Sequence, residues 1–281
     1  MTILLLAGAV SVAILPTPFL EWVLSKLFDY AADQNQTSNF WPPFSFYVFL
    51  FSGLVIGFYS HHLQRQKTPP LIEEVTKSGS FKINNSKVYC YLGSIENISD
   101  IDVVVTSENT NLDLGGISGT SVSGRIRKMA ASFNDKHELE KDYLNDFIND
   151  WKKDNGLGPF NKGQCIISPP FNAKKAGIKS IVHAVAIEKN GGMPANMDDS
   201  ATRNIVQYSI THTIEKNYKS IFIPVFGLGS GRVDRQRAID ATVDTIKAIL
   251  DRTDENLKVY IGVYRADDSF ALIKQLTKKT I

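Results

Sequence analysis

Glycines and serines follow a short apolar run near residue 103, and they are the residues of this chain best suited to hold a ligand. Val103, Val104 and Val105 predict a buried central strand. The segment after it is rich in small residues: Ser107, Gly115, Gly116, Ser118, Gly119, Ser121, Ser123 and Gly124. A helix is predicted from about Ser121. Glycines let the backbone approach a ligand, and a helix N-terminus directs free N–H groups at it. The segment is therefore either an anion-binding loop or an inert connection.

A second glycine-rich loop has the same setting. Residues 220–226, SIFIPVF, form an apolar run that leads into residues 227–234, GLGSGRVD, and a further helix. In an open α/β sheet such loops lie at the carboxyl ends of strands, where ligands bind. Two of them facing one crevice could hold a diphosphate from both sides. Arg232 would then either add a charge-assisted hydrogen bond or remain a solvated arginine. Neither loop matches a P-loop or a GxGxxG fingerprint.

The composition argues against several other kinds of site. A net charge of +2 over 281 residues gives no indication of nucleic-acid binding. The two cysteines, Cys90 and Cys165, are isolated in apolar runs and predict buried thiols rather than a disulfide or a zinc site. No histidine stands at a metal-binding spacing from Cys, Asp or Glu; the five are His61, His62, His137, His183 and His212. We therefore expect neither a metal nor a cofactor.

Two apolar segments near the N-terminus predict a membrane anchor. Residues 3–24 carry a single charge and residues 40–60 carry none. Each is long enough to cross a hydrocarbon core of roughly 30 Å. No basic residue precedes Lys26, which argues against a secretory signal peptide. The loop between the two segments is net acidic, whereas Arg65 and Lys67 follow the second one. The positive-inside rule then places the rest of the chain in the cytoplasm, and the protein in the inner (cell) membrane.

The predicted organisation is a transmembrane helical hairpin over residues 1–60, a linker over residues 61–80 and an α/β domain over residues 81–281. Gly53 and Gly57 have the spacing that lets membrane helices pack closely, a pattern that also arises by chance. Periodicity in the domain predicts strands at 81–94, 102–106, 164–168, 180–187, 220–226 and 257–264, and helices from about 121 and at 137–154, 198–217, 234–250 and 267–276. Strands separated by helices predict a sandwich with a mixed, mostly parallel sheet.

Residues 81–281 resemble the macro domains, a family of three-layer α/β/α sandwiches that bind ADP-ribose. Three stretches carry the resemblance, in the family's order: residues 100–116, DIDVVVTSENTNLDLGG; residues 163–187, GQCIISPPFNAKKAGIKSIVHAVAI; and residues 220–234. In the family the first loop holds the distal ribose and the second wraps the diphosphate. The resemblance implies a ligand site formed by Ser94, Ile95, Thr106, Asn109, Gly115, Gly116, Ile117, Ser118, Gly119, Ser123, Phe226, Gly227, Leu228, Gly229, Ser230, Gly231, Arg232 and Tyr264. It also implies that His183 is a strand residue rather than a catalyst.

Several residues depart from the family's pattern. Ser94 stands where the family has the Asp that recognises the adenine amino group, and a serine there can accept a hydrogen bond but carries no charge. Ser123 stands where hydrolytic members carry an acid, and serine is a poor general base without a partner. Thr106 replaces the first Asn of the loop motif. Glu108 replaces an Ala and is either a base, or more simply a solvated loop residue or one that tunes ligand choice. The first loop is longer than usual, which leaves room for a group attached to the ribose.

Two membrane spans followed by such a domain resemble the membrane effectors of type II Thoeris antiphage systems. The resemblance implies a sensor that is not an enzyme. A partner TIR-domain enzyme would make its ligand, histidine-ADP-ribose, from NAD. Binding would drive oligomerisation, and the effector would damage membrane lipid. Two alternatives stay open: a membrane-tethered ADP-ribosyl hydrolase that uses Asn109 and Glu108, and an anchor that recruits ADP-ribosylated proteins.

Overall fold

The computed structural model describes residues 53, 76–77, 80–188, 198–228 and 234–278. The chain divides into two compact units, Met1–Pro70 and Leu71–Ile281. The predicted spans at 3–24 and 40–60 lie outside the described residues, apart from Gly53, which is helical. Among the described residues, no helix combines the length and the apolar character needed to cross a membrane.

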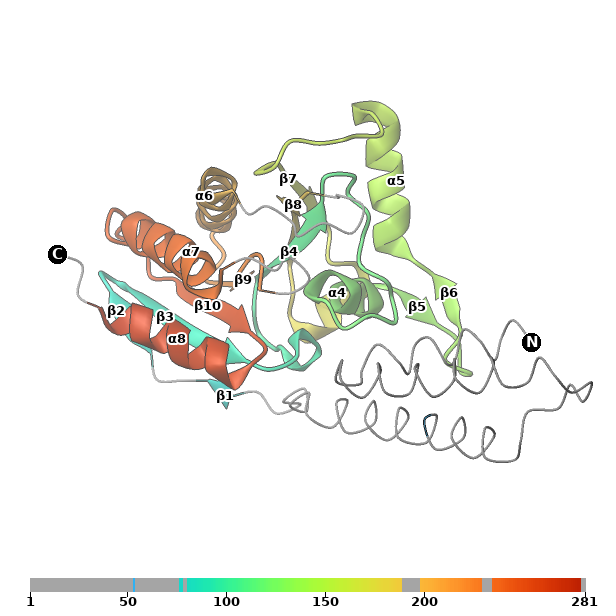
Figure 1. The fold of residues 1–281 in the computed structure, drawn as a ribbon. Helices are drawn as coiled ribbons and strands as arrows, with labels where there is room; N and C mark the ends of the chain where they lie inside the picture. The colour runs from blue at the N-terminus through green and yellow to red at the C-terminus, as the bar shows by residue number, and fades with distance from the viewer. Residues whose placement is uncertain (1–52, 54–75, 78–79, 189–197, 229–233, 279–281) are drawn as a thin grey trace, which may run out of the picture. The chain divides into compact units, whose positions relative to one another are not determined.

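The second unit is built on one mixed sheet (Figure 1). Its strands run in the order β1 (Thr76–Lys77), β3 (Ser86–Leu92), β10 (Lys258–Val263), β9 (Ser220–Pro224), β4 (Val103–Asn109), β8 (Ser180–Ile187) and β7 (Cys165–Ser168), and β2 (Phe81–Ile83) also pairs with β3. The five strands from β3 to β8 are parallel, whereas β1, β2 and β7 pair antiparallel at the edges. The mostly parallel sheet predicted from the sequence is thus confirmed.

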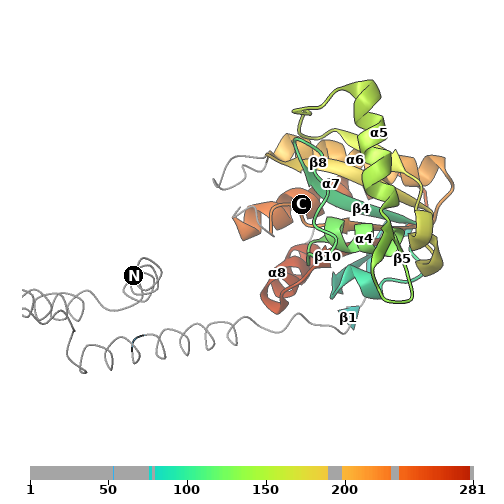
Figure 2. The same ribbon diagram turned by 90° about the vertical axis from the view of Figure 1, so that its right-hand side faces the viewer.

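Helices cover both faces of this sheet (Figures 1 and 2). On one face, α6 (Asp199–Glu215), α7 (Arg235–Leu250) and α8 (Ala266–Thr277) share a core with alternate strand residues. On the other, α4 (Val122–Ala130) and α5 (Tyr143–Asn155) contribute to two smaller cores. Two short 3-10 helices, η2 (Ile95–Asn97) and η3 (Phe171–Ala176), complete the second face. This is the predicted three-layer α/β/α sandwich.

The alternation of side chains along β4 decides which of them meet α4. Val103 and Val105 point into the core shared with α6, α7 and α8, whereas Val104 points into the core of α4. Because successive side chains of a strand point to opposite faces, Thr106 and Glu108 lie on the same face as Val104. The predicted strand ended at residue 106, but β4 continues to Asn109, so Glu108 belongs to the sheet.

Two other predicted boundaries are wrong. The helix predicted at 137–154 begins only at Tyr143, because Asp142 caps it by accepting a hydrogen bond from the Asn145 N–H. Leu139, which the helical periodicity had included, lies in β6 (Leu139–Lys141) opposite Phe133 of β5 (Ser132–Phe133) and is exposed. The predicted linker at 61–80 is interrupted by β1, which pairs with the carboxyl end of β3. The predicted starts near Ser121, Asp198 and Asp234 coincide with the N-caps of α4, α6 and α7.

Candidate functional site

The first glycine-rich loop joins the carboxyl end of β4 to the N-terminus of α4. Ser121 caps α4 by accepting a hydrogen bond from the Gly124 N–H at 3.1 Å. A Cβ atom on Gly115 would lie 2.6 Å from the Gly124 nitrogen, and one on Gly124 would collide with the Gly116 carbonyl oxygen. Gly116 itself has open space around it. Glycine is therefore required at 115 and 124 because loop and helix touch through their backbones.

Several backbone N–H groups at this junction have no acceptor in the described part of the chain. The Gly115 N–H donates to Ser123 Oγ at 2.9 Å, and the Gly119 N–H donates to the Gly116 oxygen at 2.7 Å. No described residue accepts from the N–H groups of Gly116, Ile117, Ser118, Val122 and Ser123. The first N–H groups of a helix lack internal partners, and anions bind there. The junction therefore offers a set of donors suited to phosphate or ribose oxygens.

Asn109 organises the start of this loop. Its Oδ1 accepts hydrogen bonds from the Asn111 and Asp113 N–H groups at 2.9 and 3.2 Å, and its Nδ2 donates to Asp113 Oδ2 at 3.4 Å. The amide oxygen is thus used within the loop, and Nδ2 is the atom with a further hydrogen to donate. The far side of the loop is fixed by Arg127, which donates to the Gly115 carbonyl at 3.1 Å and pairs with Asp142 at 2.7 Å.

A row of buried polar side chains runs beneath the loop. Ser123 Oγ donates to Glu108 Oε2 at 2.8 Å, and Glu108 Oε1 lies 3.6 Å from His183 Nδ1. His183 is also 3.3 Å from Thr106 Oγ1 and 2.9 Å, through Nε2, from Ser168 Oγ. The side chain of Glu108 is 1% exposed. The interpretation of Glu108 as a solvated loop residue is therefore wrong, because β4 carries it into the interior.

Ser94 and Ile95 lie at the carboxyl end of β3, but neither side chain is free. Ile95 is in the core of α4. Ser94 Oγ accepts from the Glu96 N–H at 3.2 Å and from Arg125 Nη1. Arg125 also pairs with Glu96 at 2.9 Å, and Lys128 pairs with the other carboxylate oxygen of Glu96 at 3.1 Å. Among the described residues of this cluster, Glu96 thus carries the only carboxylate. It stands two residues after Ser94, the position where the resembling family has an Asp.

Tyr264 follows β10 beside this cluster. Burial raises the pKa of its hydroxyl to about 12, with the positive charge of Arg125 a smaller opposing influence. The hydroxyl therefore stays protonated at neutral pH, and its oxygen has no hydrogen-bond partner among the described residues. Arg125 and Glu96 were missed in the sequence because α4 was interpreted there only through its apolar positions, and a contact between residues 31 positions apart has no local signal.

The second loop is described only at its two ends. Phe226 is buried in the core of α6, α7 and α8, and Leu228 packs against that core. Gly227 has a positive φ of 89°, which favours glycine. Asp234 caps α7 through the Arg237 N–H at 2.8 Å. The predicted site residues Gly229, Ser230, Gly231 and Arg232 lie outside the described residues.

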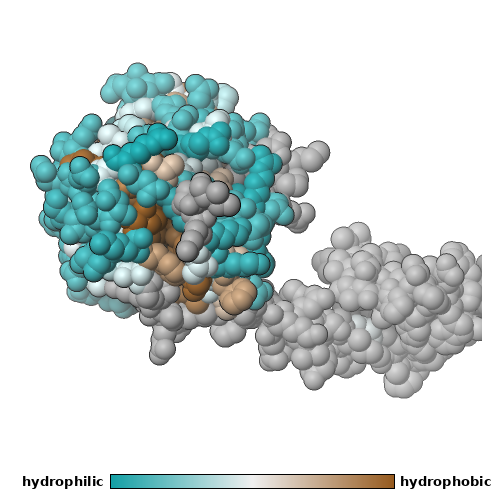
Figure 3. All heavy atoms as spheres, turned by 90° about the vertical axis from the view of Figure 1, so that its left-hand side faces the viewer, coloured by the Kyte–Doolittle hydropathy of each residue, from teal (hydrophilic) through white to brown (hydrophobic). Residues whose placement is uncertain are grey.

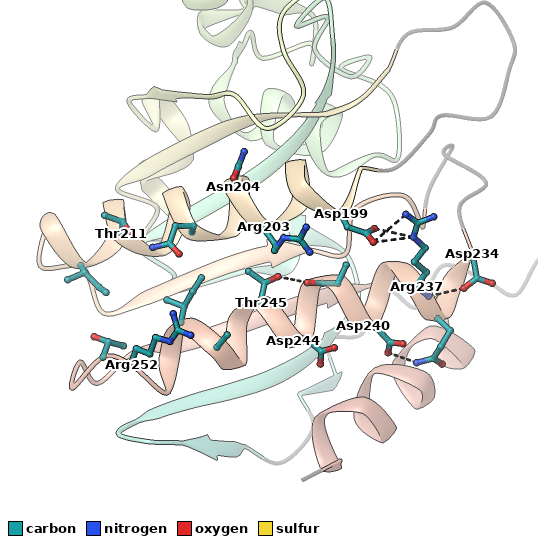
Figure 4. Close-up of a pocket in the computed structure, with 17 residues that line it drawn as sticks. Asp199, Arg203, Asn204, Thr211, Asp234, Arg237, Asp240, Asp244, Thr245 and Arg252 are labelled. Carbon is teal, nitrogen blue, oxygen red and sulfur yellow. Dashed lines mark hydrogen bonds and ion pairs between the residues drawn. The ribbon is translucent and has the colours of Figure 1, made fainter. Parts of the chain in front are cut away.

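A groove of about 1000 Å³ lies elsewhere, between α6 and α7 (Figure 4). Figure 3 shows the second unit from the side of α6, α7 and α8. This surface is largely hydrophilic, with a hollowed hydrophobic strip. Polar side chains of the groove pair with one another, as Arg237 does with Asp199 at 3.1 Å and Gln236 with Asp240 at 2.7 Å. None of the predicted site residues that the structure describes lines it. Among the described residues, no group of His, Cys, Asp and Glu could hold a metal ion.

Comparison with known proteins places the fold. No protein-family model matches the sequence, and no curated protein matches it. Among solved structures, an Oceanobacillus iheyensis macrodomain with ADP superimposes with a TM-score of 0.58 at 19% identity, over 72% of this chain and 96% of that one. A Trypanosoma brucei macrodomain in complex with ADP-ribose gives a TM-score of 0.51 at 14% identity, over 72% and 75%. The second unit therefore has the macrodomain fold.

Proposed function

We propose that the domain at residues 81–281 binds a ligand of the ADP-ribose type in the crevice at the carboxyl ends of β4 and β9. The N–H groups of residues 116–118, Val122 and Ser123, which have no acceptor among the described residues, carry the proposal, because they suit phosphate and ribose oxygens. The fold gives independent support, since the solved macrodomains named above are complexes with ADP and ADP-ribose. The second loop, at residues 227–234, would close the diphosphate from the other side.

The base of the ligand would meet Glu96 rather than Ser94. Both acceptor positions of the Ser94 hydroxyl are used by Arg125 and the Glu96 N–H, whereas the Glu96 side chain is 31% exposed. Adenine presents an amino donor beside a ring-nitrogen acceptor. A carboxylate that faces position 6 accepts from the adenine amino group but is repelled by the carbonyl oxygen of a 6-oxo purine, so Glu96 at that position would favour adenine.

The domain would bind this ligand without hydrolysing it. The Ser123 hydroxyl, at the position of the acid in hydrolytic relatives, already donates to Glu108 and accepts from Gly115. Glu108 is buried, with 2% of its surface exposed. A general base must come within hydrogen-bond reach of the proton that it removes. Under this proposal Glu108 lies too deep, and the Ser123 hydroxyl is too fully bonded, to act in this way.

In the whole chain, the two apolar segments at 3–24 and 40–60 would anchor this sensor in the inner membrane with the domain in the cytoplasm. The resemblance to type II Thoeris effectors suggests histidine-ADP-ribose from a TIR-domain enzyme as the signal. It also suggests ligand-driven oligomerisation and membrane disruption as the response. A ligand shifts an equilibrium only by its differential affinity, and a change from mostly resting to mostly assembled requires about 5.5 kcal/mol.

Calorimetric titration of the full-length chain in detergent tests this proposal. ADP-ribose and histidine-ADP-ribose are titrated separately, each mixture is analysed for hydrolysis products, and sedimentation measures the assembly state. We expect tight binding of the conjugate without hydrolysis, and a larger sedimentation coefficient on binding. Arg237→Ala, in the groove between α6 and α7, is the control and should bind as the unmodified chain does. Turnover of the ligand would favour the hydrolase alternative, and binding without assembly would favour the recruiting anchor.

A further inference from the structure

The buried carboxylate of Glu108 is incompletely hydrogen-bonded among the described residues. It is 2% exposed, at the penultimate position of the central strand β4. Its only hydrogen bond in the described part of the chain comes from Ser123, and Oε1 has none. Placing a carboxylate in the interior with an unmade hydrogen bond is costly, and such a group calls for an explanation.

The hydroxyl of Ser123 connects this carboxylate to the first loop. It donates to Glu108 Oε2 at 2.8 Å and accepts from the Gly115 N–H at 2.9 Å. A hydroxyl that donates to a carboxyl oxygen becomes a better acceptor itself, because hydrogen bonds in a series polarise one another. The two linked hydrogen bonds, from Ser123 to Glu108 and from the Gly115 N–H to Ser123, therefore hold Gly115 more firmly than Ser123 could without Glu108.

Gly115 is the residue on which the direction of the following N–H groups depends. Its N–H is fixed by Ser123 and its carbonyl is fixed by Arg127 at 3.1 Å. Its backbone also lies so close to the first turn of α4 that a side chain would not fit between them. The next residues, 116–118, carry N–H groups without a described acceptor. An orientation fixed before the ligand arrives lowers the entropic cost of binding.

We infer that Glu108 is a positioning residue, which acts through Ser123 to hold the first loop in its ligand-binding conformation. The carboxylate does not touch the ligand. The inference rests on the proposed function for its role in binding, but the hydrogen-bonded chain can be tested without a ligand. On the other side of the carboxylate, Oε1 lies 3.6 Å from His183 Nδ1, and His183 Nε2 in turn contacts Ser168 Oγ.

Hydrogen exchange of the backbone amides, measured on the full-length protein in detergent, tests directly whether the hydrogen bonds from Glu108 through Ser123 to Gly115 hold the loop. We expect Ser123→Ala and Glu108→Ala to accelerate exchange at Gly115 about tenfold, because its N–H is the one that Ser123 holds, while the amides of β4 and β8 keep their rates. Ser107→Ala is the matched control, because Ser107 Oγ is buried without a hydrogen-bond partner among the described residues. Unchanged exchange at Gly115, or equal acceleration in the loop and the sheet, would overturn the inference.

Glu108→Gln is a second variant for the case that Glu108→Ala does not fold. It also separates a positioning role from base catalysis, because an amide can accept a hydrogen bond but cannot act as a base. An amide oxygen can still accept from Ser123, so we expect exchange at Gly115 within about threefold of the unmodified chain. ADP-ribose affinity, measured in the same set, should fall about tenfold in Ser123→Ala and Glu108→Ala and recover in Glu108→Gln. If the unmodified chain binds neither ADP-ribose nor histidine-ADP-ribose, the proposed function is wrong and the exchange rates still decide this inference.

Discussion

Each end of β4 carries a buried carboxylate, and the two differ in how well they are satisfied. Asp102, just before the strand, is 9% exposed; its Oδ2 accepts from the Lys219 and Ser220 N–H groups at 2.7 and 3.1 Å, and Lys179 pairs with Oδ1 at 2.7 Å. Glu108, at the other end, is more deeply buried and accepts one described hydrogen bond. The satisfied carboxylate joins three strands, whereas the poorly satisfied one lies under the loop where a ligand is proposed.

This contrast agrees with where α/β sheets bind ligands. The amino end of a parallel sheet serves stability, and the carboxyl end carries the site. Cavity size indicates a different place, the groove between α6 and α7, where Arg237 is paired with Asp199. The site is proposed instead where, among the described residues, backbone donors lack an acceptor and a buried carboxylate is incompletely bonded.

The largest effect is expected from Asp102→Ala. It leaves the Lys219 and Ser220 N–H groups buried without an acceptor, which should lower the free energy of unfolding by about 3 kcal/mol. Urea unfolding measures this loss. Affinity for ADP-ribose should stay within about twofold, and a large loss of affinity would break the division between the two ends of β4.

The same carboxylate predicts a pH dependence. Burial raises the pKa of Asp102, but the hydrogen bonds from Lys179, Lys219 and Ser220 outweigh it and hold the pKa below the ordinary 3.8. Asp102 therefore contributes stability above pH 3.8, and that stability is lost as the pH falls through the lowered pKa. Asp102→Asn should flatten the acid limb of stability between about pH 5 and pH 2. An unchanged acid limb would contradict this assignment.

Gly124→Ala should have the next largest effect. Alanine gains up to about 1 kcal/mol of helix propensity over glycine. The new Cβ collides with the Gly116 carbonyl oxygen, so we expect a net loss of about 2 kcal/mol in the free energy of unfolding. Gly116→Ala is the control, because a Cβ atom at residue 116 would have no atom within 4 Å and should not disturb the packing. Equal stability of the two variants would show that the loop is not held against α4.

Glu96→Gln sharpens the account of the base. Loss of the charge weakens the pairs with Arg125 and Lys128 and removes the stronger acceptor for an amino group. We expect ADP-ribose affinity to fall about tenfold, or about 1.4 kcal/mol, and the preference over inosine diphosphate ribose to shrink. Competition calorimetry with the two ligands measures both quantities. If the preference stays the same, Glu96 does not contact the base.

The smallest effect is expected in the groove between α6 and α7. Arg237→Ala removes a pair with Asp199 in which the arginine side chain is 59% exposed. Exposed pairs contribute about 0–1 kcal/mol, and thermal unfolding should show a shift within that range. Binding of ADP-ribose should not change. A loss of affinity here would place the ligand in the groove rather than at the carboxyl end of β4.

Much of the fold could be predicted from local patterns. The apolar runs at residues 103–105, 180–187 and 220–226 identified central strands, and polar N-caps such as Asp198 and Asp234 marked helix starts. The helical periodicity failed at Leu139, because the cap at Asp142 and the pairing with Phe133 compete with it.

The site was predictable only in part, because its key contacts join distant residues. The glycines of the first loop follow from composition and order. The hydrogen bond between Ser123 and Glu108 depends on the face of β4 that Glu108 occupies. The strand was predicted to end at residue 106, so the sequence did not predict a face for Glu108. The contact of Arg125 with Ser94 and Glu96 depends on the packing of α4 against η2, which no local pattern encodes.

Backbone amide shifts on titration with ADP-ribose test the central claim most directly. The account predicts the largest chemical-shift changes in a ¹H–¹⁵N spectrum at residues 116–118 and at Val122 and Ser123, with little change along α6 and α7. Changes concentrated at Asp199, Arg203 and Arg237, or no changes at saturating ADP-ribose, would contradict it.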